Sequence, residues 1–260
     1  MNNYKVAIIG AGNMGGSIAR GLAHGTYIST SNIIVSNPSN SKLEKLKEEY
    51  PDIHITNSNE QAVEHANIII LAVKPWKVEE VLTSLHLSQN QVLVSVAAGI
   101  SCEELSQYTA PSTSIIRAIP NTAISELASL TLITSINASH EELSLIIDIF
   151  NEMGIAMPIE ENCFPAATAL TSCGIAYVFK YVQAAMQAGT ELGIKPKESM
   201  KMLAQTLEGA AQILLNHAET HPAIEIDKVT TPGGITIKGV NSLEHSGFTS
   251  AIIKAIKESV

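Results

Sequence analysis

The chain has 260 residues, an apolar content of 45% and a formal net charge of −9. That length allows one large domain or two modest ones, and the negative charge with few aromatic residues argues against nucleic-acid binding. No apolar run is long enough to span a membrane, no basic-then-apolar leader opens the chain, and three widely spaced cysteines favour a reducing cytoplasm, so we expect a soluble, acidic, cytoplasmic protein.

A glycine-rich turn follows the first strand pattern. Residues 5–9 form a short strand pattern rich in β-branched residues, and they run into Gly10-Ala11-Gly12-Asn13-Met14-Gly15, after which a helical pattern begins. Gly10 permits the tight turn, Gly12 lets the backbone approach a pyrophosphate, and Gly15 lets helix and strand pack closely. This strand–turn–helix context predicts dinucleotide binding.

The end of the second strand (32–35) indicates which dinucleotide is preferred. An NAD-selective site usually carries an acidic residue there to hold the ribose 2′-hydroxyl. None stands between Ile33 and Leu43; Ser36, Asn37 and Ser39 are neutral donors that tolerate a 2′-phosphate, and Lys42 supplies charge. NADPH is therefore the expected cofactor, with NADH possible because the loop has no arginine. The same residues also read as an N-cap cluster for the next helix.

Alternating strand and helix patterns continue to about Thr122, and a strand, a helix and a final strand then close the domain at about residue 161. The expected strands are 53–56, 67–73, 91–97, 114–118, 130–134 and 156–159; the expected helices are 41–50, 60–65, 78–85 and 141–153, and Ser101 with Glu104 forms a capping box. The fold class is α/β, with a Rossmann-like doubly wound sheet in residues 1–161.

Strand patterns are absent from about Phe164 onward. We expect one long helix over 165–192, then helices at 196–217 and 223–229 and two more after a glycine turn. Alanine-rich stripes on these helices suit tight helix packing, so residues 162–260 are predicted to be an all-helical dimerisation domain. His217 and His221 lack the H-E-x-x-H pattern, and no metal is expected.

This later turn, the glycine–threonine loop, lies within Asp227 to Val240. Pro232, Gly233 and Gly234 end one helix, and helical spacing resumes at Ile235, so free N–H groups should face out of this loop and attract a carboxylate. Thr231 and Thr236 add hydroxyl groups. A plain helix-to-helix turn is the alternative, but paired with a dinucleotide fold the loop suits a small cyclic imino acid, whose nitrogen needs orientation more than a strong acid.

These motifs together resemble the pyrroline-5-carboxylate reductase family along essentially the whole chain. The likeness is carried by Gly10 to Gly16, Ala72-Val73-Lys74-Pro75, Ala97 to Ile100, Pro120-Asn121-Thr122 and, most specifically, the T-P-G-G-x-T loop. The resemblance implies NAD(P)H-dependent reduction of 1-pyrroline-5-carboxylate to L-proline, the last step of proline synthesis. It also implies a homodimer interlocked through the helical domains and often assembled into larger rings such as a decamer.

The resemblance also implies site residues. The cofactor would contact Gly10, Gly12, Asn13 and Met14 at its phosphates, Ser36 and Asn37 at the 2′-position, Asn59 at the adenosine ribose, and Ala72, Lys74 and Pro75 along the dinucleotide. The substrate would contact Thr231, Gly233 and Gly234, while Thr236 holds the imine nitrogen and orients it. One departure stands out: Ser172-Cys173-Gly174-Ile175 replaces the family's usual G-S-G-P.

Two other functions fit parts of the sequence. Lys180 and Gln183 approximate the helical lysine and amide of 3-hydroxyacid dehydrogenases, which share a dinucleotide fold. A non-catalytic, NADP-binding regulatory paralogue would keep the N-terminal motif, although an intact T-P-G-G-x-T loop argues against it.

Overall fold

A computed structural model describes residues 3–260 of the chain. Its backbone divides into two compact units, Met1–Ser172 and Cys173–Val260. The functional division into residues 1–161 and 162–260 stays a prediction, because a unit of packing and a unit of function need not share a boundary.

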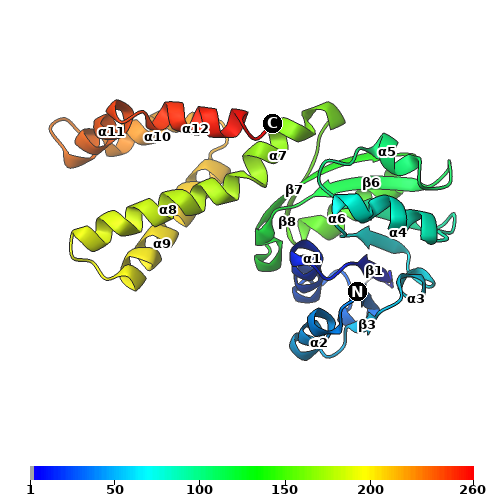
Figure 1. Ribbon diagram of the computed structural model, residues 1–260. Coiled ribbons are helices and arrows are strands. Elements are labelled where there is room, and N and C mark those ends of the chain that lie inside the picture. Colours follow the sequence, from blue (N-terminus) through cyan, green and yellow to red (C-terminus); the bar gives the residue numbers. More distant parts are fainter. Residues whose placement is uncertain (1–2) are drawn as a thin grey trace. The chain divides into compact units, whose positions relative to one another are not determined.

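The first unit is built on one eight-stranded sheet (Figure 1). The strands are β1 (Val6–Ile9), β2 (Ile33–Ser36), β3 (His54–Thr56), β4 (Ile68–Leu71), β5 (Val92–Ser95), β6 (Ser114–Ile119), β7 (Ser129–Ile136) and β8 (Gly154–Pro158). Their order is β3-β2-β1-β4-β5-β6-β7-β8. Strands β1 to β6 are parallel, β7 runs antiparallel to β6, and β8 is parallel to β7. This is the predicted doubly wound sheet, extended at one edge.

Helices cover both faces of the sheet because the strands are apolar on both sides. Side chains of α1 (Asn13–His24), α2 (Asn40–Glu49) and α6 (His140–Asn151) pack on the face that includes Val6 and Ile8. Side chains of α3 (Asn59–Val63), α4 (Val78–Ser84) and α5 (Cys102–Ser106) pack on the face that includes Ala7 and Ile9. Alternation along β1 therefore divides the core into two layers.

Two helices of this unit begin with capping boxes that can be recognised in the sequence. The capping box of Ser101 and Glu104 is confirmed at α5, and a second one, from Ser139 and Glu142, starts α6. Short 3₁₀ turns complete the unit: η1 (Thr30–Asn32), η2 (Pro75–Lys77), η3 (Thr122–Glu126) and η4 (Glu161–Cys163).

A buried arginine ties η4 to the sheet. The Arg117 guanidinium on β6 pairs with Glu161 at 2.5 Å and lies 4.6 Å from the ring centroid of Phe164. Glu161 also accepts the backbone N–H of Cys102 at 2.8 Å. Burial, reinforced by the Glu161 charge, raises the pKa of the Cys102 thiol to about 12, so this cysteine stays protonated and unreactive.

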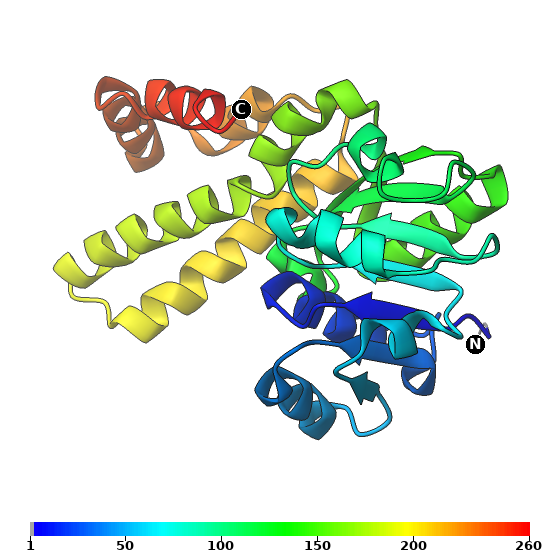
Figure 2. The same ribbon diagram turned by 45° about the vertical axis from the view of Figure 1, so that its right-hand side comes forward.

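The second unit consists of helices alone (Figures 1 and 2). They are α8 (Gly174–Glu191), α9 (Pro196–Asn216), α10 (Pro222–Val229), α11 (Ile235–His245) and α12 (Phe248–Lys257). Helices α8 and α9 form an antiparallel hairpin whose turn places Gly193 at φ +91°, with the Ile194 N–H bonded to the Gly189 carbonyl. Among residues 173–260, only Ser199 is buried.

The predicted helix over 165–192 is wrong. The structure has α7 (Phe164–Thr171) and α8 separated at Ser172 and Cys173, where the boundary between the units also falls. The Ser172 hydroxyl donates to the Pro120 carbonyl at 3.3 Å, and Gly174, a poor helix former, follows. Apolar spacing runs unbroken through this segment, so periodicity alone joins the two helices.

No helix found within residues 3–260 combines the length and apolarity that crossing a membrane requires.

Replacing Gly154 with alanine should destabilise the first unit. Gly154 has φ +135°, and a Cβ there would overlap the backbone of Ser129 on β7. Gly99 has φ +77° but open space around its Cβ position, so Gly99→Ala serves as a control for backbone strain alone. Chemical denaturation should show a loss of roughly 3 kcal/mol or more for Gly154→Ala and about 1 kcal/mol for Gly99→Ala. Equal losses would contradict this account.

Candidate cofactor and substrate sites

The glycine turn after β1 forms a narrow backbone cradle. Gly10 has φ +102°, and a Cβ there would lie 2.8 Å from the Ala72 carbonyl oxygen at the end of β4. A Cβ on Gly15 would overlap the Gly10 carbonyl, whereas a Cβ on Gly12 would meet nothing within 4 Å. Gly10 and Gly15 are thus required by packing within the chain, and Gly12 faces open space at the start of α1. That difference matches the separate roles predicted for the three glycines.

The loop after β2 is fastened to this cradle by Asn37. The Gly10 N–H donates to the Ser36 carbonyl at 2.8 Å, and the Ala11 N–H donates to Asn37 Oδ1 at 3.1 Å. Asn57 Nδ2 in turn donates to the Asn37 carbonyl at 2.9 Å. Asn37 therefore shapes the turn itself, a role that no local sequence pattern announces.

Ser36 and Asn59 come together but face inward. Ser36 is fully buried, and its Oγ donates to Asn59 Oδ1 at 2.7 Å. Asn59 begins α3 and is half-buried. In this arrangement Ser36 holds Asn59 in place and presents no hydroxyl to solvent.

The fourth predicted segment, Ala72 with Lys74 and Pro75, lies at the carboxyl end of β4. Strands β1 and β4 are neighbours, and the strand order reverses between them, which is the switch point where doubly wound sheets bind ligands. Lys74 is exposed, and its Nζ lies 5.9 Å from the ring centroid of Trp76, which is 76% exposed. The cofactor residues predicted from four separated segments therefore all lie near the carboxyl ends of neighbouring parallel strands.

The glycine–threonine loop belongs to the second unit. Gly233 has φ +73°, and Gly234 is the N-cap of α11 but provides no side-chain cap. The Gly234 N–H donates to the Thr231 carbonyl at 3.0 Å, and a Cβ on Gly234 would lie 2.7 Å from Thr231 Oγ1. Thr236, in the first turn of α11, is exposed and has no side-chain hydrogen bond within the described residues. The start of this helix thus has N–H groups without a side-chain cap next to an exposed hydroxyl, an arrangement that favours anionic ligands.

The residues that suggest other chemistry lie elsewhere in the second unit. Lys180 Nζ donates to Gln183 Oε1 at 3.0 Å on the exposed surface of α8. His221 Nδ1 accepts the Ala223 N–H at 3.2 Å and so caps α10. Across residues 3–260, no group of three or more His, Cys, Asp or Glu side chains is placed to hold a metal ion.

Comparison with known families first defines a class. A family model described as "NADP oxidoreductase coenzyme F420-dependent" matches residues 5–99, and one described as "Pyrroline-5-carboxylate reductase dimerisation" matches residues 161–260. The cradle and the sheet thus place the chain among nucleotide-dependent oxidoreductases.

Full-length relatives narrow that class. Pyrroline-5-carboxylate reductase 2 of Dictyostelium discoideum is 36% identical over 98% of this chain and 90% of its own length. Pyrroline-5-carboxylate reductase 1 of the same organism is 38% identical over 98% of this chain, which spans 48% of that longer protein. The crystal structure of 1-pyrroline-5-carboxylate reductase from Streptococcus pyogenes is 29% identical, with a TM-score of 0.87 over 98% of this chain and 96% of that one. The pyrroline carboxylate reductase of Plasmodium falciparum, solved with NADP bound, is 27% identical with a TM-score of 0.87 over 100% and 96% of the two chains. The chain belongs to the pyrroline-5-carboxylate reductase family.

Alanine substitutions in the glycine turn should separate folding from cofactor binding. Gly12→Ala should change the free energy of unfolding by less than about 1 kcal/mol, because its Cβ meets nothing, yet it should abolish detectable NADPH binding. Gly15→Ala should lower both stability and binding. Thermal melts with calorimetric titration of NADPH would check this, and normal binding by Gly12→Ala would contradict the predicted approach of the cofactor.

Proposed function

We propose that this protein reduces 1-pyrroline-5-carboxylate to L-proline with NADPH. The carrying observation is that one chain holds both a dinucleotide cradle and an uncapped glycine–threonine helix start, in a family whose relatives are pyrroline-5-carboxylate reductases. NADH is the weaker alternative cofactor.

The residues of the cradle fit a dinucleotide. Gly10, Gly12, Asn13 and Met14 provide backbone at the start of α1, where the N–H groups and the helix dipole favour a pyrophosphate. The remaining cofactor residues border the same sheet edge: Asn37, Asn59 with Ser36 behind it, Ala72, Lys74 and Pro75. When bound, NADPH supplies a hydride to the carbon of the C=N bond.

The glycine–threonine loop holds the substrate. Its carboxylate accepts N–H groups from Gly233 and the first turn of α11, and the Gly234 N–H joins them by giving up its bond to the Thr231 carbonyl. The Thr231 hydroxyl lies at the same turn. Because a carboxylate is acceptor-only, a ring of donors suits it well.

Thr236 orients the imine nitrogen. A threonine hydroxyl is far too weak an acid to protonate substrate near neutral pH, but an iminium nitrogen already carries its proton and needs only alignment. The exposed Thr236 hydroxyl, which has no partner among residues 3–260, is available for that bond. This explains how reduction proceeds without a strong acid among the site residues.

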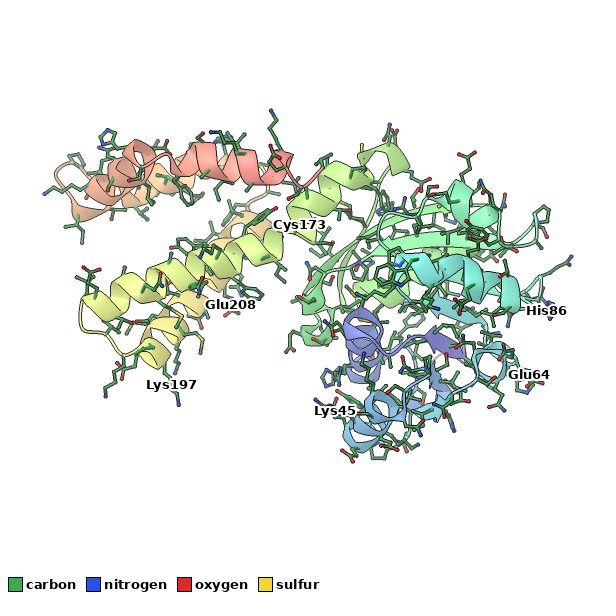
Figure 3. The ribbon with its side chains drawn as sticks, viewed as in Figure 1. Lys45, Glu64, His86, Cys173, Lys197 and Glu208 are labelled. Atoms are coloured by element: carbon green, nitrogen blue, oxygen red, sulfur yellow. The ribbon has the colours of Figure 1, made fainter. Side chains whose placement is uncertain are left out.

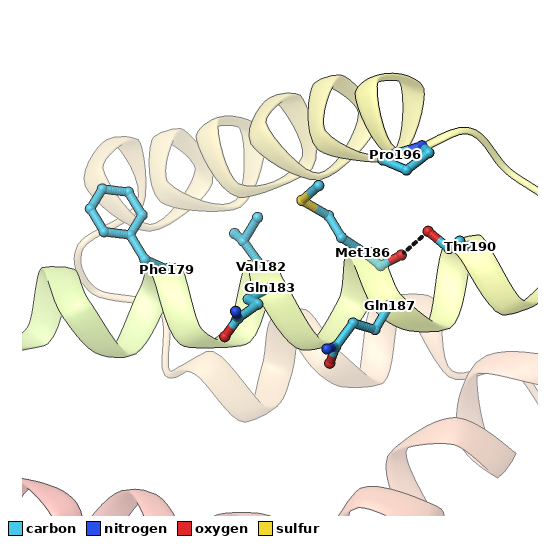
Figure 4. A pocket seen from close by; sticks show the side chains of 7 residues that line it. All are labelled: Phe179, Val182, Gln183, Met186, Gln187, Thr190 and Pro196. Carbon is cyan, nitrogen blue, oxygen red and sulfur yellow. Dashed lines mark hydrogen bonds between the residues drawn. The ribbon is translucent and has the colours of Figure 1, made fainter.

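The helical unit, residues 162–260 in the sequence-based division, is proposed to form a homodimer and to allow a larger ring such as a decamer. Apolar side chains are widely exposed there: Phe179 is 63% exposed, Leu215 65% and Ile235 87%. Phe179, Val182 and Met186 point from α8 toward α9 and, with Pro196, line a groove of about 510 Å³ (Figure 4). Residues 173–260 contain one buried residue, Ser199, and so lack the core to fold alone; a second copy would supply the missing contacts. The three free cysteines of the chain, Cys102, Cys163 and Cys173, fit the expected reducing cytoplasm.

The activity is tested by NADPH oxidation with 1-pyrroline-5-carboxylate, alongside a panel of other cyclic imines and 2-ketoacids. Thr236→Val should lower kcat at least about 10-fold, equivalent to about 1.4 kcal/mol of transition-state stabilisation, while NADPH affinity is unchanged. Thr236→Ser retains the hydroxyl and should keep most of the activity. Lys180→Ala should remain active with 1-pyrroline-5-carboxylate. If the wild-type enzyme instead turns over a hydroxyacid and Lys180→Ala abolishes that activity, the dehydrogenase function is favoured. No turnover of any imine by the wild-type enzyme would leave only a nucleotide binder.

The oligomer is tested by analytical ultracentrifugation. Phe179→Glu places a charge on the exposed apolar face of α8, so it should shift the protein from dimer to monomer and lower its melting temperature. Phe179→Leu keeps the surface apolar and should stay dimeric. A wild-type monomer at all concentrations, or a dimeric Phe179→Glu variant, would contradict the proposal.

A further inference from the structure

A basic pocket of about 200 Å³ opens beside the glycine turn, between α1 and α2. It is lined by the turn and α1 on one side and by α2 on the other: Ala11, Gly12, Asn13, Gly16 and Arg20, then Lys42, Lys45 and Leu46. Figure 3 shows Lys45 on α2. The pocket therefore joins the predicted pyrophosphate cradle to Arg20 on the same helix and to Lys42 and Lys45 from a separate segment.

The charges in this pocket are unbalanced. Arg20 Nε and Nη2 donate to the two Glu49 carboxylate oxygens at 2.5 and 3.1 Å, and this hydrogen bonding raises the pKa of Arg20. Lys45 acts on Glu49 only through its charge, and Lys42 has no hydrogen bond or ion pair within residues 3–260. Three cations against one carboxylate leave an excess of two positive charges facing the cavity.

We propose that Lys42 and Lys45, with Arg20, bind the 2′-phosphate of NADPH and so select NADPH over NADH; this rests on the proposed function only in taking a nicotinamide dinucleotide as the ligand. A phosphate monoester carries about −1.5 to −2 charges at pH 7, which matches that excess. Arg20 is already held in a fixed direction by Glu49, so its remaining guanidinium N–H groups are preorganised for phosphate oxygens.

Position supports the same ligand. The pocket begins at Gly12 and Asn13, the proposed pyrophosphate site, and it ends at the first turns of α2, directly after the β2 loop, which in this fold lies near the adenosine ribose. Ser36, the other candidate for the 2′-position, is buried and bonded to Asn59. Helix α2 also begins without a side-chain cap at Ser39, so its first N–H groups add positive potential near Lys42.

If these cations contacted the pyrophosphate instead, the expected effect on the affinities for NADPH and NADH would differ. Both NADPH and NADH carry a pyrophosphate, so that contact would serve the two cofactors equally. A 2′-phosphate contact acts on NADPH alone. Affinity measured with each cofactor therefore separates the two arrangements.

The test is calorimetric titration of the full-length protein with NADPH, NADH, adenosine 2′,5′-bisphosphate and 5′-AMP, using K42Q, K45Q and the double variant. Lys5→Gln is the charge-matched control, because Lys5 precedes the amino end of β1 and the glycine turn follows the carboxyl end of that strand. Wild type and K5Q should bind NADPH more tightly than NADH, and the bisphosphate more tightly than 5′-AMP. Each lysine variant should weaken NADPH and bisphosphate binding roughly 10- to 100-fold and leave NADH and 5′-AMP affinities close to wild type.

Two outcomes would overturn the proposal: unchanged NADPH affinity in K42Q/K45Q, or equal weakening of NADPH and NADH in a variant whose thermal melt matches wild type. Trp76, the one tryptophan in the chain, offers a second binding signal through quenching of its fluorescence. These titrations need no imine substrate, so failure of imine reduction and failure of this pocket are separate results.

Discussion

The close approach of two backbones, Gly10 after β1 and Ala72 after β4, underlies the nucleotide-binding half of this protein. Gly10 leaves the strand with a positive φ, and its missing side chain lets the turn lie against the Ala72 carbonyl. That contact occurs where the strand order reverses, so it fixes the start of α1 at the switch point of the sheet. The orientation of the cradle, and with it every proposed cofactor contact, depends on Gly10, because a side chain at that position would collide with the Ala72 carbonyl.

Stability is distributed very differently in the two units. The first has apolar layers on both faces of its sheet and a buried Arg117–Glu161 pair that secures the chain before α7. The second has long helices, of which α8 and α9 approach closely at Gly189 and Ser199, and many of its large apolar side chains are exposed. A sheet buries its strands within one chain, whereas an open set of helices requires an additional surface. Assembly and substrate binding are therefore proposed for the same part of the molecule.

The chemistry proposed here asks little of any single side chain. The cofactor provides the hydride, glycine backbone at two helix starts receives the anionic groups, and one threonine aligns the nitrogen. Discrimination between cofactors then falls to residues outside the reacting centre. We propose that the basic pocket formed jointly by α1 and α2 meets that need, since it places positive charge beside the glycine turn after β1.

The amino-acid sequence by itself determined the fold class, the glycine turn, the capping box at Ser101 and the family, because each depends on local geometry or on motifs that are contiguous in the chain. The family and the doubly wound sheet are confirmed; the roles given to individual site residues stay predictions. Tertiary structure alone decided the break at Ser172, where a hydroxyl bonds a carbonyl 52 residues away in sequence, and the inward turn of Ser36 toward Asn59. It also brought Arg20 and Lys42 to one cavity. Such contacts join distant segments, and periodicity and motif spacing report only on neighbours along the chain.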